Sequence, residues 1–153
     1  MATRVRPTAK PLYEEDFYVW TEVQAGLLRA RRFTALDLDH LIEEVEDLAD
    51  RKLSAVLNGA RVVMEHLLKL QHSPASDPRN VWRASVREHR RRVQTDITPR
   101  IEQLLAEQLP RFYAMARDDA AAGLRDHGEH AAADALPATC PYTLDQITTD
   151  WWP

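Results

Sequence analysis

The sequence has 153 residues, 44% of them hydrophobic and 29% charged, and a formal net charge of −4. This length suffices for one domain with a buried core, so neither a disulfide nor a metal is needed for stability. The mild net charge selects neither nucleic acid nor an acidic substrate. The chain has a single cysteine, Cys140, and no apolar stretch of the roughly 18 residues that a membrane-spanning helix requires. We therefore expect a cytoplasmic protein without membrane contact.

Residues 1–12 are polar and contain Pro7 and Pro11, which predicts a flexible N-terminal arm. Residues 13–153 are expected to form a single helical-bundle domain. The first helix is predicted over 13–31, because acidic residues stand in its first turn and arginines close it, the order that the helix dipole favours.

The second predicted helix, over 37–71, has the clearest pattern in the chain. Its apolar residues recur at alternating steps of three and four, as in helical bundles and coiled coils. This seam consists of Leu38, Leu41, Val45, Leu48, Lys52, Val56, Gly59, Val63, Leu67 and Leu70. At 1.5 Å per residue such a helix is about 50 Å long. Glycine costs a helix about 1 kcal/mol against alanine, so Gly59 is where we expect a bend, if any.

Proline and capping signals divide the next part of the chain. We expect Asp77 to cap a third helix that begins at Pro78. In the same way Thr98 is expected to cap a fourth helix that begins at Pro99. Pro110 should end or kink this fourth helix, because proline removes a backbone donor and clashes one turn back.

The C-terminal part is expected to pack on the bundle. Residues 125–138 are polar or alanine-rich and predict either an ordered loop or a short helix. Residues 143–146 have the form of a capping box, which predicts a final short helix. Trp151 and Trp152 follow, and their apolar area predicts that the tail is held against the protein. The expected fold class is therefore all-α, an antiparallel helical bundle of about five helices built on one long central helix.

Several segments together resemble one known family, the bacterial domain of unknown function 29. The segments occur in the family's order and cover nearly the whole chain: Tyr13–Trp20, Leu41–Leu48, His66–Lys69, Trp82–Arg90 and Cys140–Leu144. The resemblance implies a small all-helical fold and no established activity. After His66–Lys69 the family usually has Trp-Gln-Tyr-Gln-Pro, where this chain has Leu-Gln-His-Ser-Pro over residues 70–74. A site that used that aromatic pair is not expected here.

An acidic row forms the first candidate surface. Glu43, Glu46, Asp47 and Asp50 stand three or four residues apart and share one face of the second helix. Such a row can bind a divalent cation or a basic partner. Di-metal bundles, however, place a histidine three residues after a glutamate, and no glutamate of this row is followed in that way. We interpret the row as a solvated face and expect no metal and no cofactor.

The third helix is basic, which gives a second candidate surface. Arg83, Arg87, Arg90 and Arg91 share one of its faces, as in a helix that recognises DNA or RNA. In a simple antiparallel hairpin these arginines lie opposite residues 58–67, where Glu65 is the only acid. The acidic and basic faces are therefore expected to meet between protomers, or only after a shift in register.

The corner between the second and third helices is a third candidate. His66 and Lys69 lie one turn apart before it, and Trp82, Arg83 and Arg87 follow it. With Arg90 they could hold an anion or a partner near the helix start. The alternative, which we favour, is that His66 and Trp82 only pack this corner.

Other patterns that would define a chemistry are absent from the sequence. It has no glycine-rich phosphate loop, no Gly-x-Ser-x-Gly, no His-Glu-x-x-His and no paired cysteine motif. Cys140 is interpreted as a small buried residue, and we expect no catalytic residue. The leading hypothesis is a non-enzymatic interaction or scaffold protein that forms a homo-oligomer through its helical faces, with a protein partner as a further option. The alternative is a nucleic-acid or anion-binding module that uses the basic third helix, and an enzyme with a metal on the acidic face comes third.

Overall fold

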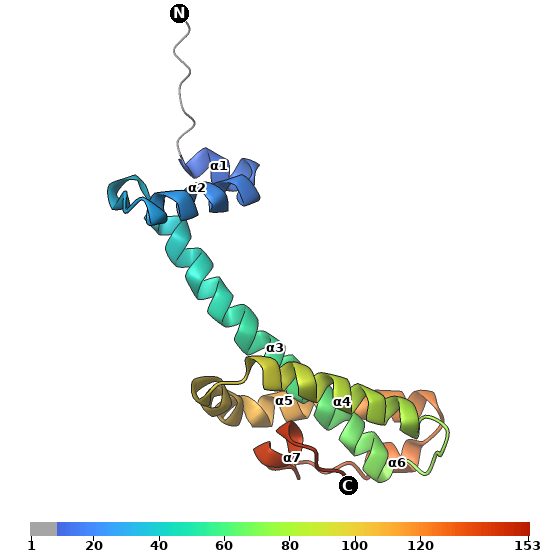
Figure 1. The fold of residues 1–153 in the computed structure, drawn as a ribbon. Helices are drawn as coiled ribbons and strands as arrows, with labels where there is room; N and C mark the ends of the chain where they lie inside the picture. Colours follow the sequence, from blue (N-terminus) through green and yellow to red (C-terminus); the bar gives the residue numbers. More distant parts are fainter. Residues whose placement is uncertain (1–8) are drawn as a thin grey trace, which may run out of the picture. The chain divides into compact units, whose positions relative to one another are not determined.

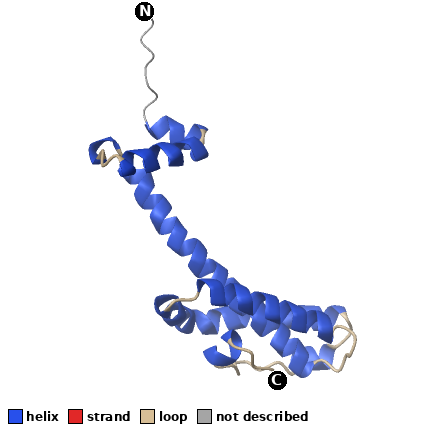
Figure 2. Ribbon diagram, viewed as in Figure 1, coloured by secondary structure: helices blue, strands red, loops and turns tan. Residues whose placement is uncertain are grey.

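The computed structural model describes residues 9–153, and within them every regular element is helical (Figures 1 and 2). The helices are α1 (Ala9–Glu15), α2 (Phe17–Arg29), η1, a short 3-10 helix (Phe33–Ala35), α3 (Leu38–His72), α4 (Arg79–Asp96), α5 (Pro99–Asp126), α6 (His130–Asp134) and α7 (Leu144–Thr148). The predicted all-α bundle on one long helix is confirmed, since α3 has 35 residues and packs against α4 and α5. None of the described helices is long and apolar enough to cross a membrane.

The chain divides into two compact units, residues 1–49 and 50–153. We call them unit 1 and unit 2. Helix α3 contributes residues to both, because the division falls after Ala49. That residues 13–153 form a single domain stays a prediction. Of the predicted arm over 1–12, residues 1–8 lie outside the described part, and α1 begins at Ala9.

In unit 1 the single helix predicted over 13–31 is wrong, because the structure has two helices that meet at Asp16. The Asp16 backbone is extended (φ −150°, ψ 86°), and its carboxylate accepts a hydrogen bond from the amide of Val19 at 3.1 Å. Asp16 therefore caps α2 and does not continue α1. Aspartate competes with the helix in this way because its short side chain reaches backbone donors. The prediction counted Asp16 only as a favourable first-turn charge.

In unit 2, α4 runs antiparallel to the second half of α3, and α5 returns along both (Figure 1). The core comprises Val56, Leu57, Ala60, Val63, Met64, Leu67 and Leu68 of α3, Val86 and Val93 of α4, and Leu105, Tyr113, Ala116, Ala120, Ala121 and Leu124 of α5. Gly59 lies at the closest approach of α3 and α4. A Cβ at this position would lie 2.7 Å from Cγ2 of Val93, so glycine lets the two helices pack together.

The predicted boundaries of α4 and α5 hold in part. Thr98 caps α5 as predicted, since its hydroxyl accepts from the amide of Ile101 at 3.3 Å. Pro78, not Asp77, occupies the cap position of α4, and no side chain bonds there. Helix α5 continues through Pro110 to Asp126, so of the end or kink expected at this residue the end does not occur. Both Pro110 and Ala106, one turn earlier, are exposed, so water can bind the carbonyl that proline leaves without a donor.

The segment over 125–138, left open between a loop and a short helix, contains the short helix α6. Helix α5 ends in a Schellman motif around Gly128, which has a φ of +78°. The amide of Gly128 donates to the carbonyl of Arg125 and that of Glu129 to the carbonyl of Leu124, both at 2.9 Å. This turn sets the positions of His127 and Glu129. The predicted capping box is also confirmed, with Thr143 and Gln146 bonded in both directions at the start of α7.

Candidate functional site

A buried polar network lies in unit 1 and was missed by the sequence analysis. At its centre Asp37 accepts hydrogen bonds from Nε1 of Trp20 at 3.2 Å and from Nδ1 of His40 at 2.7 Å. The amide of Asp37 donates to Oε1 of Gln24 at 2.9 Å. Burial alone would raise the pKa of Asp37, but the bonds from His40 and Trp20 outweigh it and hold the pKa below its ordinary value. The network ties α2 to the start of α3.

Tyr13 covers this network from α1. Its ring stacks on the ring of His40, with 3.9 Å between centroids, and its hydroxyl donates to Oε1 of Glu44 at 2.7 Å. The bond to the Glu44 carboxylate raises the pKa of Tyr13 to about 12, because it favours the protonated phenol. The sequence contained a signal for this site, because Tyr13 and Trp20 are the first and last residues of one segment that carries the family resemblance.

An apolar surface also covers unit 1. Ten of the twelve exposed large hydrophobic side chains among the described residues belong to this unit: Phe17, Tyr18, Val19, Val23, Leu28, Phe33, Leu38, Ile42, Val45 and Leu48. A groove of about 280 Å³ between α2 and the start of α3 is lined by Phe17, Leu28, Val45 and Leu48 of this set. We call these four side chains the apolar face. By contrast, Trp20 is the only buried hydrophobic side chain in the described part of the unit.

The predicted acidic row is solvated, as the charges in it suggest. All four of its side chains are exposed, and none forms an ion pair with another described residue. They are Glu43, Glu46 and Asp47 of unit 1 and Asp50 of unit 2. The described residues contain no group of three or more His, Cys, Asp or Glu side chains placed to hold a metal ion. The row is therefore an exposed, charged surface.

The arginines of α4 have different surroundings although they share a helix face in the sequence. Arg90 is 4% exposed, and its guanidinium donates to the carbonyls of Gln146 (2.7 Å), Ile147 (3.1 Å) and Trp151 (2.7 Å). The chain from α7 to the C-terminus is thus held against α4. These bonds use Nε and Nη2, whereas Nη1 is buried and has no hydrogen-bond partner among the described residues, so Arg90 has a structural role in holding the tail.

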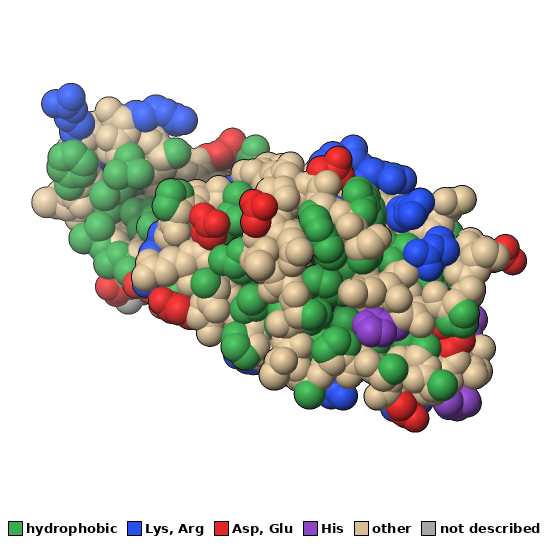
Figure 3. Space-filling view, turned by 90° about the horizontal axis from the view of Figure 1, so that it is seen from below, with side chains coloured by type: hydrophobic (Ala, Val, Ile, Leu, Met, Phe, Trp, Pro, Cys, Tyr) green, Lys and Arg blue, Asp and Glu red, His purple; other side chains and the backbone are tan. Residues whose placement is uncertain are grey.

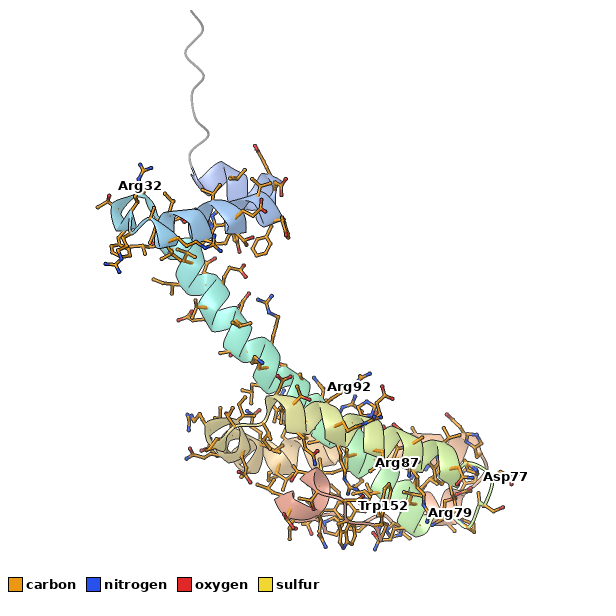
Figure 4. The ribbon with its side chains drawn as sticks, viewed as in Figure 1. Arg32, Asp77, Arg79, Arg87, Arg92 and Trp152 are labelled. Atoms are coloured by element: carbon orange, nitrogen blue, oxygen red, sulfur yellow. The ribbon has the colours of Figure 1, made fainter. Side chains whose placement is uncertain are left out.

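Arg83, Arg87 and Arg91 remain exposed on the same helix. None of them forms an ion pair within the described part of the chain. Arg87 lies near the C-terminal Trp152, with 6.0 Å from its Cζ to the ring centroid (Figure 4). A cavity of about 440 Å³ lies here, lined by Ala84, Arg87, Arg90, Arg91, Gln94, Thr149 and Asp150. Figure 3 shows Lys and Arg side chains in a row along one edge of this part of the molecule.

The corner between α3 and α4 contains a second cavity of unit 2. Lys69 and Trp82 line it, together with residues of the α3–α4 loop and of the end of α5, and its volume is about 400 Å³. His66 does not line it. Burial lowers the pKa of His66 and favours the neutral ring. The six residues predicted for this corner therefore do not form one site. Lys69 and Trp82 line this cavity, whereas Arg87 and Arg90 line the cavity of about 440 Å³ described above.

Cys140 agrees with its interpretation as a packing residue. It is half-buried against the core, and Sγ lies 3.9 Å from Sδ of Met64. Burial raises its pKa, which favours the thiol over the reactive thiolate.

Fold and surfaces together define a helical-bundle protein with an exposed apolar face, an arginine row and cavities in its C-terminal unit. The chain belongs to the family described as Domain of unknown function DUF29, which matches residues 12–152. Comparisons with curated proteins and with solved structures gave no match.

Proposed function

We propose that this protein is a non-enzymatic, cytoplasmic interaction protein that self-associates through the apolar face of unit 1. The observation that carries the proposal is the concentration of exposed apolar side chains on α2 and the first part of α3. A contiguous exposed apolar patch on a soluble protein typically marks an interaction surface.

The size of unit 1 supports the same conclusion. The unit has 49 residues, and one hydrophobic side chain, that of Trp20, is buried within its described part. Domains this small rarely bury enough apolar area alone and are commonly stabilised by disulfides, metals or oligomerisation. The single cysteine excludes an internal disulfide. A second copy supplies the missing apolar contacts.

The seam of α3 gives a third argument. In unit 2 its members Val56, Val63 and Leu67 are buried against α4 and α5. In unit 1 Val45 and Leu48 continue the same three-and-four spacing but are more than half exposed. A helical seam of this spacing is the surface through which helices pair. The unit 1 part of the seam is thus suited to pairing with a helix of another protomer.

The test compares two valines of similar exposure. Val45, on the apolar face, is 66% exposed, and Val81, at the start of α4, is 69% exposed. The association state of the full chain is measured by analytical ultracentrifugation over a concentration series. Val45→Asp is expected to weaken association by at least about tenfold, because it places a charge in the contact, whereas Val81→Asp leaves it unchanged. Val45→Ser and Val81→Ser repeat the comparison without a new charge.

A monomer at every concentration would contradict self-association. Equal loss of association in both aspartate variants would place the contact elsewhere. Circular dichroism of each variant checks that the helices are retained, because both valines are exposed and neither substitution removes core packing.

A second candidate function rests on the arginine row of α4. Arg83, Arg87 and Arg91 recur every four residues, are exposed and have no acidic partner within residues 9–153, which is a suitable surface for phosphates of RNA or DNA. Binding to short RNA and DNA duplexes is measured at two salt concentrations. If this function is correct, affinity falls steeply with salt and falls again in Arg83→Ala and Arg87→Ala. Affinity unchanged by both substitutions would exclude the row as the binding surface.

A further inference from the structure

The cavity at the corner of α3 and α4 has a composition that the proposed function does not use. It is lined by Lys69, Ala75, Asp77, Pro78, Trp82, Gly123, Leu124, His127 and Glu129. These residues come from the end of α3, the loop and start of α4, the end of α5 and the turn that leads to α6. Figure 4 shows Asp77 just before the start of α4. Several separate elements therefore converge on one partly open cavity of about 400 Å³.

The cation of this cavity is already neutralised. Nζ of Lys69 lies 2.6 Å from Oε1 of Glu65, and both side chains are largely buried. Gly123 makes room for the lysine, because a Cβ there would lie 2.8 Å from its Nζ. A charge-assisted bond of this kind takes up much of the ammonium's capacity to attract an anion. The anion site predicted for this corner is therefore not supported by the lining.

The carboxylates and the imidazole of the lining offer acceptors. Oε2 of Glu129 is buried and has no hydrogen-bond partner among the described residues. Nδ1 of His127 lies 2.8 Å from the carbonyl of Gly123. Because a carbonyl only accepts, Nδ1 carries the proton of the neutral ring and Nε2 is left as an acceptor. Asp77 adds a second carboxylate. A buried carboxylate oxygen without a donor is costly, and a donor that enters the cavity relieves this cost.

Trp82 supplies an aromatic wall. It is half-buried and lines the cavity with the apolar side chains of Leu124 and Pro78. The face of an indole ring attracts a cation, most strongly where water is excluded. An aromatic wall, apolar neighbours and carboxylate acceptors form the combination that recognises an amine with an apolar body.

We propose that this cavity binds a small organic ammonium ion whose charge is held by Glu129 and Asp77 and whose apolar body lies against Trp82. The site is independent of the apolar face, because every lining residue belongs to unit 2.

Three probes that share one body test the charge requirement. Binding of 2-phenylethylammonium, 2-phenylethanol and 3-phenylpropionate to the full chain is measured by isothermal titration calorimetry. The ammonium is expected to bind at least about tenfold more tightly than the alcohol, and the carboxylate more weakly than both. Equal affinity for ammonium and alcohol would overturn the proposal. Preference for the carboxylate would overturn it in favour of an anion site.

Matched variants locate the site. Glu129→Gln keeps the shape of the side chain and removes its charge, so the affinity for 2-phenylethylammonium is expected to fall by about tenfold. Glu107→Gln, the same change at an exposed position of α5 outside the cavity, is expected to leave it unchanged. Unchanged affinity in Glu129→Gln would overturn the assignment of the charge contact.

Gly123→Ala tests the cavity without removing a polar group. The added methyl group meets the flexible end of Lys69, which can move into the cavity, so the fold is retained while the space is reduced. Gly26→Ala is the control, because no atom lies within 4 Å of a Cβ at that position. Weaker binding of the ammonium probe in Gly123→Ala alone supports the site. Equal binding in both glycine variants argues against it.

Discussion

The indole nitrogen of Trp20 donates a hydrogen bond to Oδ2 of Asp37 at 3.2 Å, and this bond joins α2 to the residue before α3. Among the described residues of unit 1, Trp20 is the buried hydrophobic side chain, and Asp37 and Gln24 are the buried polar ones. The described core of this unit is therefore a small polar network, in contrast to the apolar core of unit 2. The stability of unit 1 therefore depends on the charge of the Asp37 carboxylate.

Loss of that charge should destabilise unit 1. Asp37→Ala removes the acceptor for Trp20 and His40 and leaves buried donors without partners, which costs about 1–3 kcal/mol. The indole N–H signal of Trp20 in NMR spectra reports the effect, and Trp20→Phe assigns that signal. An unshifted Trp20 signal and an unchanged melting temperature in Asp37→Ala would contradict this prediction.

The same carboxylate predicts sensitivity to acid. The pKa of Asp37 is lower in the folded protein than its ordinary value of about 4. Its contribution to stability is therefore complete above about pH 4 and is lost as the pH falls through the lower folded value. Melting temperature measured against pH should decline in this acid range more steeply for the wild type than for Asp37→Asn. Parallel profiles would show that Asp37 does not set the decline.

Tyr13 predicts a second pH dependence, at the alkaline end. The hydrogen bond to Glu44 raises its pKa to about 12. The stability that this bond contributes is present below about pH 10 and is lost as the pH rises through the folded pKa. Glu44→Gln should lower the pKa of Tyr13. The difference in phenolate absorbance between each protein and its Tyr13→Phe partner isolates this titration, and an unshifted midpoint in Glu44→Gln would disprove the assignment.

Arg90 should be far more sensitive to substitution than its neighbour Arg91. Arg90→Gln removes a charged donor from three tail carbonyls, and we expect the free energy of unfolding to fall by about 2–3 kcal/mol. Arg91→Gln, at an exposed position, should change it by no more than about 0.5 kcal/mol. Urea unfolding measures both, and proteolysis near the C-terminus should accelerate only in the Arg90 variant. Similar effects at the two positions would mean that the tail is not held by this side chain.

Two of the helical glycines, Gly59 and Gly26, should respond to alanine in opposite directions. At Gly59 the new methyl group meets Cγ2 of Val93 at 2.7 Å, so overpacking is expected to cost about 1–3 kcal/mol. At Gly26 the space is open, and alanine should stabilise α2 by up to about 1 kcal/mol. Thermal unfolding distinguishes the two variants. Stabilisation by both would mean that α3 and α4 do not approach closely at Gly59.

The sequence by itself determined the helices and much of their ends. Local patterns predict the cap at Thr98 and the capping box at residues 143–146, because each depends on hydrogen bonds within a few positions. They also predict α3, because its seam is a spacing of three and four residues along the chain. The break at Asp16 shows the limit of such patterns. A short acidic side chain either favours the first turn of a helix or caps the next one, and composition does not distinguish these roles.

Only the tertiary structure decided what the charged residues do. Arg90 and Arg91 are equivalent in a sequence pattern, but the carbonyls that surround Arg90 come from more than 50 positions away. Lys69 pairs with Glu65 one turn earlier in the same helix, which the sequence spacing allows, but its cavity is completed by Glu129 from a distant turn. The free energy of a charged side chain depends on how deeply it is buried and on which groups lie near it. Both are fixed only when the chain folds.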